Sequence, residues 1–185
     1  MTPRRIVDAY IRDYRLGARR QLRFYRNQRN LSDAIQVAGL CQLPGGQRHP
    51  HQRRLPGATL REVVERLQRV SNNLAQAQNF TELHRLVERE IGHIRFVGPL
   101  TVYDVAHRIG AFLRIAPILV YLHRGTKEGA HALGRGGDTV RPDELPIAFR
   151  DLRPAEIEDC LCIYKRELRA RVRPVRIRPR RPPPC

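Results

Sequence analysis

The side chains best suited to acid–base chemistry lie between residues 104 and 128. Asp104 and His107 are three residues apart within a predicted helix, so they share one face of it. His123, Lys127 and Glu128 follow on a polar, glycine-punctuated segment that is able to fold back onto that face. A carboxylate, an imidazole and an amine held together supply groups for proton transfer and nucleophilic attack. We therefore take Asp104, His107, His123 and Lys127 as candidate catalytic residues. The alternative is that Asp104 complements a helix N-terminus while Lys127 and Glu128 are solvated.

Basic residues greatly outnumber acidic ones. The 185 residues include 35 Lys and Arg against 18 Asp and Glu, which gives a formal net charge of +17. Such an imbalance favours polyanionic partners: DNA, RNA or an anionic membrane surface. Only Lys127 and Lys165 are lysines, so part of the arginine excess reflects coding preference. That preference does not explain the small number of acidic residues, and the inference of a polyanionic partner remains.

Nothing in the sequence predicts a membrane segment or an export signal. No apolar run approaches the roughly 18 residues that a membrane-spanning helix needs. The first residues, MTPRRIVDAYIRDYR, lack the apolar stretch of a secretory signal. The cysteines at positions 41, 160, 162 and 185 do not have the spacing of a disulfide scaffold. We expect a cytoplasmic protein with no membrane partner.

The sequence contains no metal or cofactor motif. His49 and His51 have no further ligands nearby, and no Cys/His pairs stand at zinc-finger spacing. Gly125, Gly129 and Gly134 fit neither a Walker loop nor a dinucleotide fingerprint. We therefore expect neither a metal nor a cofactor.

Apolar residues recur mainly at helical spacing, which predicts an all-α fold. We expect a single helical domain of about six to eight helices over residues 1–170, close to the usual size of one domain. Thr59 and Glu62 form a capping-box pattern that predicts the start of one helix. Asn79 or Thr81 starts the next helix.

A turn between two predicted helices reads VGPLT over residues 97–101. This turn resembles the helix-hairpin-helix motif of DNA-binding proteins that do not read sequence. In the motif a glycine permits the tight turn, and free amides at the second helix's N-terminus meet a phosphate. Pro99 replaces the family's second glycine and removes one of these amides. The residues for which the resemblance implies DNA contacts are Val97, Gly98, Leu100 and Thr101.

Some DNA glycosylases build their active site around the same hairpin within an all-helical domain, so the resemblance also implies base-excising activity. The lysine that lyase members carry before the hairpin threonine is Leu100 here. Segment 114–120 contains no carboxylate where that family has an aspartate. An enzyme of this kind would need another pocket with a carboxylate and a water or amine.

Further phosphate contacts are predicted from three basic segments, each of which has a solvated surface as its alternative. One is a helix face near the N-terminus, one is the Pro- and Gly-rich loop over residues 43–57, and one is residues 171–185. In the last segment arginine alternates with proline, which predicts a disordered basic tail. The arginines singled out on the helix face are Arg4, Arg12, Arg19, Arg23 and Arg26. Those of the loop and of the later polar segment are Arg48, Arg53, Arg54 and Arg124.

These observations favour a DNA-binding protein that contacts the phosphate backbone through the hairpin, in DNA repair or phage defence. The first alternative is a glycosylase-like enzyme acting on a modified or damaged base. The second is an RNA-binding or ribosome-associated protein, which the Arg-rich tail supports because such segments often fold on RNA. Aromatic residues make up only 6% of the chain and tryptophan is absent, so a base-stacking surface is poorly supplied. The sequence thus ranks DNA above RNA.

Overall fold

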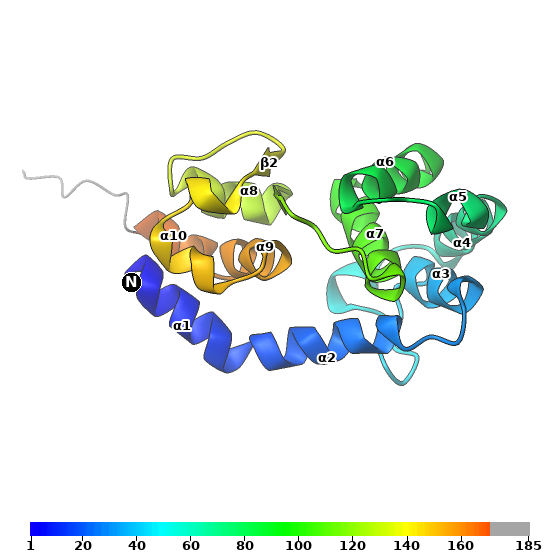
Figure 1. The fold of residues 1–185 in the computed structure, drawn as a ribbon, viewed down its shortest axis with the longest axis horizontal. Coiled ribbons are helices and arrows are strands. Elements are labelled where there is room, and N and C mark those ends of the chain that lie inside the picture. The colour runs from blue at the N-terminus through cyan, green and yellow to red at the C-terminus, as the bar shows by residue number, and fades with distance from the viewer. Residues whose placement is uncertain (171–185) are drawn as a thin grey trace, which may run out of the picture.

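The described part of the chain forms two helical lobes joined by one helix and one non-helical segment (Figure 1). The computed structural model describes residues 1–170, and the predicted basic tail, 171–185, lies outside the described residues. Within residues 1–170 there are ten α-helices and one pair of short antiparallel strands. The all-α prediction is confirmed, although the helices are more numerous and shorter than the sequence pattern suggested.

The first lobe contains the N-terminal helix and the C-terminal third of the described chain. Its core includes Ile6, Phe149, Ile157 and Leu161, all of which are fully buried. The strands pair in register with Val120 opposite Val140. The elements of this lobe are α1 (Pro3–Asp13), β1 (Val120–Tyr121), α8 (Arg124–His131), β2 (Thr139–Val140), 3₁₀ turns at Pro142–Glu144 and Ile147–Asp151, α9 (Pro154–Ile163) and α10 (Lys165–Ala170).

The second lobe surrounds α7, the longest helix of the described chain. Helices α2, α3 and α6 pack against α7, so buried side chains lie on most sides of it. The core of this lobe includes Ile35, Leu67, Leu83 and Ile109. Its elements are α3 (Leu31–Gly39), a 3₁₀ turn at Pro50–Gln52, α4 (Gly57–Arg69), α5 (Ser71–Ala75), α6 (Phe80–Ile91) and α7 (Pro99–Leu113).

Helix α2 (Arg15–Arg26) runs from one lobe to the other and contacts both (Figure 1). At its start Arg15 and Arg19 form ion pairs with Glu156 of α9, at 3.2 and 2.9 Å. At its end the Tyr25 hydroxyl donates to the backbone carbonyl of Gln42. The segment 114–119 is the second connection between the lobes. The two lobes are thus held at a defined spacing by charged and polar contacts from a single helix.

Three pairs of consecutive helices are each separated by a single residue. The backbone leaves helical geometry at Tyr14 (φ −121°), Val70 (φ −109°) and Tyr164 (φ −97°), although the apolar pattern continues across each break. The predicted capping box at Thr59 and Glu62 was wrong. Helix α4 already begins at Gly57, so the Thr59 side chain is buried inside the first turn. Glu62 instead pairs with Arg66 at 3.0 Å, one turn further along.

Asn79 caps α6, one of the two starts that the sequence allowed. Its side-chain oxygen accepts from the Glu82 amide at 3.0 Å. This contact satisfies one of the free amides that every helix start leaves unpaired.

Candidate functional site

Two adjoining cavities lie where α2 crosses from one lobe to the other. The larger one, about 390 Å³, is called the arginine basin here. The smaller one, about 130 Å³, is called the inner cavity and is lined by α2, α7, α9 and loop 43–57. Leu22 and His107 line both cavities, so the basin and the inner cavity meet at these two side chains.

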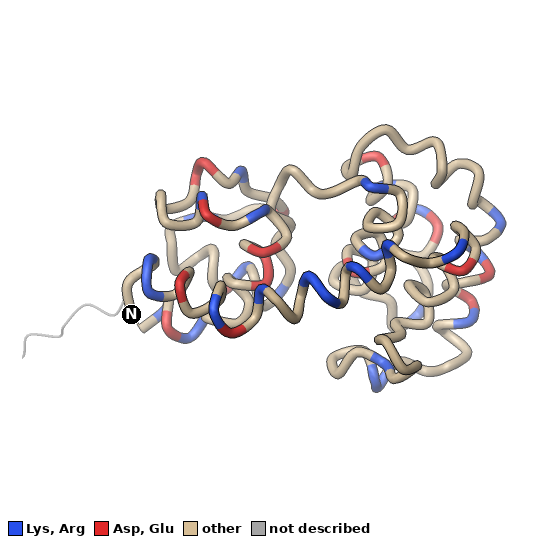
Figure 2. The backbone as a smooth tube through the Cα atoms, turned by 60° about the horizontal axis from the view of Figure 1, so that its bottom comes forward, with Lys and Arg blue, Asp and Glu red and all other residues tan. Residues whose placement is uncertain are grey.

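The arginine basin concentrates positive charge between the lobes. Helix α2 supplies Arg19, Arg23 and Arg26, three residues of the predicted basic face, and Figure 2 shows this run of basic residues along the helix. Arg114 and Arg153 complete the basin from the segment after α7 and the start of α9. Among residues 1–170 only Arg19 of these five has an acidic partner, Glu156. Unpaired like charges around one hollow produce a strong positive potential, which attracts anions.

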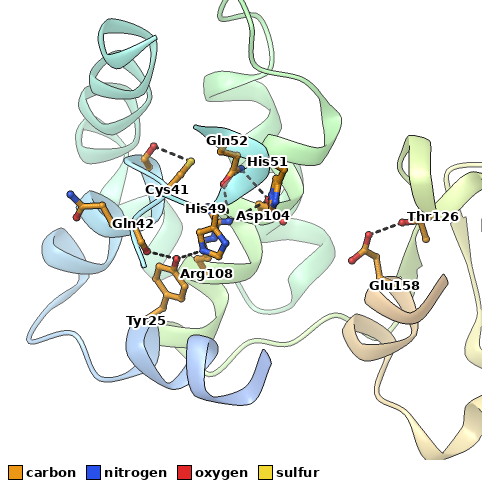
Figure 3. A network of polar contacts seen from close by, with 11 residues as sticks. Tyr25, Cys41, Gln42, His49, His51, Gln52, Asp104, Arg108, Thr126 and Glu158 are labelled. Carbon is orange, nitrogen blue, oxygen red and sulfur yellow. Dashed lines mark hydrogen bonds and ion pairs between the residues drawn. The ribbon is translucent and has the colours of Figure 1, made fainter. Parts of the chain in front are cut away.

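One wall of the inner cavity is a hydrogen-bonded network centred on Asp104 (Figure 3). Its carboxylate contacts His51 Nε2 at 2.8 Å, Gln52 Nε2 at 3.0 Å and Arg108 Nη2 at 3.3 Å. Burial alone would raise the pKa of Asp104, but Arg108 and His51 outweigh it and hold that pKa below its usual value. Asp104 is therefore ionised at neutral pH, and it fixes loop 43–57 to α7.

Tyr25 extends this wall toward α2. Its hydroxyl lies 2.9 Å from His49 Nε2, and the Arg108 guanidinium lies 5.6 Å from the centre of its ring. Burial, followed by the charge of Arg108, lowers the pKa of His49 to about 4. His49 is neutral at physiological pH as a result.

The opposite wall carries two acidic side chains from α9. Glu158 accepts a hydrogen bond from the Thr126 hydroxyl at 2.6 Å, and Asp159 accepts one from the Tyr10 hydroxyl at 3.0 Å. Figure 3 shows Glu158 and Thr126 across from the Asp104 network. Within residues 1–170 neither carboxyl forms an ion pair with an Arg or Lys. Burial raises the pKa of both groups, and the negative charge of Asp159 raises that of Glu158 further.

Two residues that line the inner cavity each carry a buried polar atom with no hydrogen-bond partner in the described chain. These atoms are the Tyr103 hydroxyl and Arg108 Nη1. Tyr103 is 2% exposed and Arg108 is 5% exposed, and both side chains line the inner cavity. Leaving a buried donor unpaired costs roughly 1–3 kcal/mol, and more for a charged group. Native folds seldom retain such groups without a reason, and an absent ligand is one.

The predicted catalytic residues are only partly brought together. Asp104 and His107 both line the inner cavity. His123 lies behind Tyr103, with ring centres 4.8 Å apart, and its Nε2 has no partner among residues 1–170. Burial lowers the pKa of both histidines to about 4. Lys127 lies outside the cavity lining and pairs with Asp138 at 2.9 Å on the surface.

The hairpin residues predicted to contact DNA divide into buried and open positions. Val97 and Thr101 are buried, while Leu100 is 39% exposed. Gly98 has an extended backbone (φ −107°, ψ 173°), and a Cβ placed there would meet nothing within 4 Å. The expectation that Gly98 makes the tight turn was wrong. The left-handed residue is Phe96 (φ 73°), and α7 begins at Pro99.

The predicted arginines of loop 43–57 have separate positions. The Arg48 guanidinium donates to the Leu55 carbonyl at 2.9 Å and so closes the loop on itself. Arg53 and Arg54 are exposed beside it, and Arg124 is exposed at the first position of α8. None of these four lines the basin or the inner cavity.

Sequence reasoning missed Tyr103, Arg108, Glu158 and Asp159. The helical pattern gave no signal for Glu158 and Asp159, because they lie between Ile157 and Cys160 in sequence and therefore point away from the apolar stripe that buries α9.

Residues 1–170 include no helix long and apolar enough to cross a membrane. The same residues hold no cluster of three His, Cys, Asp or Glu side chains arranged to bind a metal ion. Comparison with protein-family models, with curated proteins and with solved structures found nothing that matches this chain.

Proposed function

We propose that this protein binds DNA by its phosphate backbone and admits the base of one unpaired nucleotide to the inner cavity. The observation that carries the proposal is the junction of the two cavities at Leu22 and His107. A basin of arginines suits phosphate, because guanidinium groups donate to phosphate oxygens in forked pairs. A hollow lined by several polar side chains beside it suits a base that has left the helical stack.

The charges of the basin support a backbone contact. Arg23, Arg26, Arg114 and Arg153 form no ion pair within the described chain, so an anion would relieve their mutual repulsion. The open N-terminus of α7 at Gly98 is a second place where a phosphate could approach, as the resemblance to the helix-hairpin-helix motif implies.

The inner cavity also supports a second function, hydrolysis of the bond between a base and its sugar. The observation that favours it is the acidic pair on α9, whose raised pKa values keep one proton available near neutral pH. In the proposed step a water oxygen bonds to the sugar C1′ while the bond from C1′ to the base nitrogen breaks. The bonding electrons leave with the base, which takes the Glu158 proton, and the Asp159 carboxylate accepts the proton of the attacking water.

A comparison of two charge-matched variants tests the DNA contact. In Arg23→Gln/Arg26→Gln both changes lie in the basin, and in Arg5→Gln/Arg20→Gln both lie on exposed positions outside it. Binding of labelled duplex DNA, single-stranded DNA and duplex RNA is measured by fluorescence anisotropy across a salt series. The basin variant is expected to weaken duplex DNA binding and to reduce the salt slope by about one for each lost phosphate contact. Equal losses in both variants, or tighter binding of RNA, would contradict the proposal.

The hydrolytic step is tested separately with Asp159→Asn. Asparagine keeps the size of the side chain and still accepts the Tyr10 hydrogen bond, but it does not accept a proton from water. Release of free base from duplexes with single damaged or mismatched bases is followed by chromatography. The expected result is loss of base release with DNA affinity within about twofold of wild type. If the wild-type protein releases no base from any duplex, the protein binds DNA without this chemistry.

A further inference from the structure

We infer that the arginine basin binds the terminal phosphate of a DNA strand and that Arg114 contacts this phosphate. The inference rests on the proposed DNA-binding function and names the part of the DNA that the basin takes. The unpaired nucleotide is then the last one of its strand, with its phosphate in the basin and its base at the inner cavity. Three features carry the inference: the charge of the basin, the origin of its walls and the backbone at Arg114.

The basin carries more positive charge than one internal phosphate neutralises. Five arginines line it, and no aspartate or glutamate does. Glu156 compensates Arg19 at 2.9 Å, so four guanidinium groups remain without an acidic partner within residues 1–170. An internal phosphodiester carries one negative charge, whereas a terminal phosphate monoester carries about 1.5 to 2 at neutral pH and presents three oxygens to forked donors. The monoester therefore matches the basin better.

The walls of the basin come from both chain segments that join the lobes. Helix α2 lines one part of it, and residues 114–116, which belong to the second connection, line another. An internal phosphate has a nucleotide attached on each side, and both of these neighbours would have to fit around the two segments. A terminal phosphate has only one attached nucleotide. That nucleotide can extend toward the inner cavity, which adjoins the basin at Leu22 and His107.

The backbone at Arg114 is one that glycine adopts more easily. This residue follows α7 and has φ 63° and ψ 24°, in the left-handed region where a side chain brings strain. Helices often end on such a residue, and it is usually glycine. The turn is made by backbone groups, since the amides of Arg114 and Ile115 both donate to the Gly110 carbonyl. Glycine would make the same turn with less strain, so an exposed arginine at the basin points to a role for its guanidinium.

Three variants separate this role from general charge and from folding. Arg114→Gln removes the guanidinium and its charge. Arg69→Gln is the matched control, because Arg69 is exposed at the end of α4 and lies outside both cavities. Arg114→Gly removes the side chain together with the backbone strain, so we expect it to raise Tm by about 2 °C and to affect DNA binding as Arg114→Gln does.

The test uses DNA duplexes of one sequence with a single unpaired nucleotide. This nucleotide is either internal, opposite an abasic analogue, or a one-nucleotide overhang that ends in a phosphate or in a hydroxyl, with 5′ and 3′ overhangs both measured. Binding is followed by fluorescence anisotropy at fixed salt. We expect wild type to bind a phosphorylated overhang of one polarity about tenfold more tightly than the hydroxyl overhang or the internal nucleotide. General attraction to the added phosphate charge affects Arg114→Gln and Arg69→Gln alike, because both lose one positive charge.

The inference is supported if both Arg114 variants reduce the preference for the phosphorylated end to threefold or less while Arg69→Gln retains it. It is overturned if the hydroxyl overhang or the internal nucleotide binds wild type as tightly, or if the preference is the same in all variants. In those cases the proposed DNA-binding function stands. Thymidine 5′-monophosphate is measured alongside by calorimetry. If it binds and no duplex does, the monoester belongs to a free nucleotide, and the inference and the proposed function both fail. They also fail together if nothing binds.

Discussion

Removing the Tyr103 hydroxyl should make the free protein more stable and the DNA complex weaker. In Tyr103→Phe the ring remains in place, packed against Phe80 and Tyr121 at centre distances of 5.9 and 5.3 Å and against His123 at 4.8 Å. The atom that is lost has no hydrogen-bond partner within residues 1–170. The substitution removes a buried oxygen that has no hydrogen-bond partner and leaves the packing of the ring intact. The free-energy cost of keeping that oxygen away from water is therefore removed.

The magnitude follows from that cost. A buried unsatisfied hydroxyl destabilises a fold by roughly 1–3 kcal/mol, so we expect Tyr103→Phe to raise the unfolding free energy by about 1 kcal/mol. In a chain of this length such a change raises Tm by about 2–4 °C. A hydrogen bond from the hydroxyl to a bound base would contribute about 0.5–1.5 kcal/mol, so its loss should weaken binding roughly two- to twelvefold.

Urea denaturation and thermal melting measure the first effect, and anisotropy with a duplex carrying one unpaired nucleotide measures the second. Tyr10→Phe is the contrasting variant, because its hydroxyl donates to Asp159 at 3.0 Å. The same chemical change there should destabilise the protein by about 1 kcal/mol or more, since it removes a partner from a buried carboxyl. If Tyr103→Phe is destabilising, the hydroxyl is already bonded in the free protein. If it is stabilising but leaves affinity unchanged, the hydroxyl does not face the ligand.

Three further predictions concern the charged network, the acidic pair and the hairpin. Asp104→Asn leaves the Arg108 guanidinium buried without a counter-charge, so we expect urea denaturation to show an unfolding free energy lower by about 3 kcal/mol. Glu62→Gln, in the exposed pair with Arg66, should lower the unfolding free energy by less than about 1 kcal/mol. Burial raises the pKa of Glu158, so its contribution to stability is complete below pH about 4.5 and is lost as the pH rises through the raised pKa. Glu158→Gln should therefore make the unfolding free energy less dependent on pH between about 4.5 and 8, in urea titrations at a series of pH values. Gly98→Lys should change the unfolding free energy by less than about 0.5 kcal/mol, because the backbone at Gly98 is extended and a Cβ there meets no other atom. Weaker DNA binding by this variant, despite its added positive charge, would show that the start of α7 contacts phosphate.

Local features of the site could be predicted from the sequence. Helical spacing placed Asp104 and His107 on one face of one helix, and both line the inner cavity. The same periodicity gathered Arg19, Arg23 and Arg26 on one face of α2, where they form part of the basin. These predictions depend only on the geometry within a single helix, which follows from the chain itself.

The remaining features depend on contacts between distant segments. Arg108 is buried because Gln52 and Tyr25 lie over it, more than fifty and eighty residues earlier in the chain. Glu158 and Asp159 belong to the cavity only because α2 holds α9 opposite α7. Lys127 belongs to the predicted polar segment, but α8 directs it toward Asp138 on the surface. No periodicity within one segment encodes these distances.

Some polar side chains around the inner cavity are fully hydrogen-bonded and others lack a partner, and this pattern supports a ligand-binding role for the cavity. On α7, the Asp104 carboxylate has three partners, and loop 43–57 supplies two of them. A fold selected only for stability could satisfy Tyr103 and Arg108 in the same way, or replace the tyrosine with phenylalanine at no loss of packing. Instead both groups line a hollow whose far wall holds two carboxyls without a basic partner in the described chain. Polar groups on both walls are complementary to a small polar ring between them, and the adjoining arginines are complementary to the phosphate that such a ring would carry in DNA.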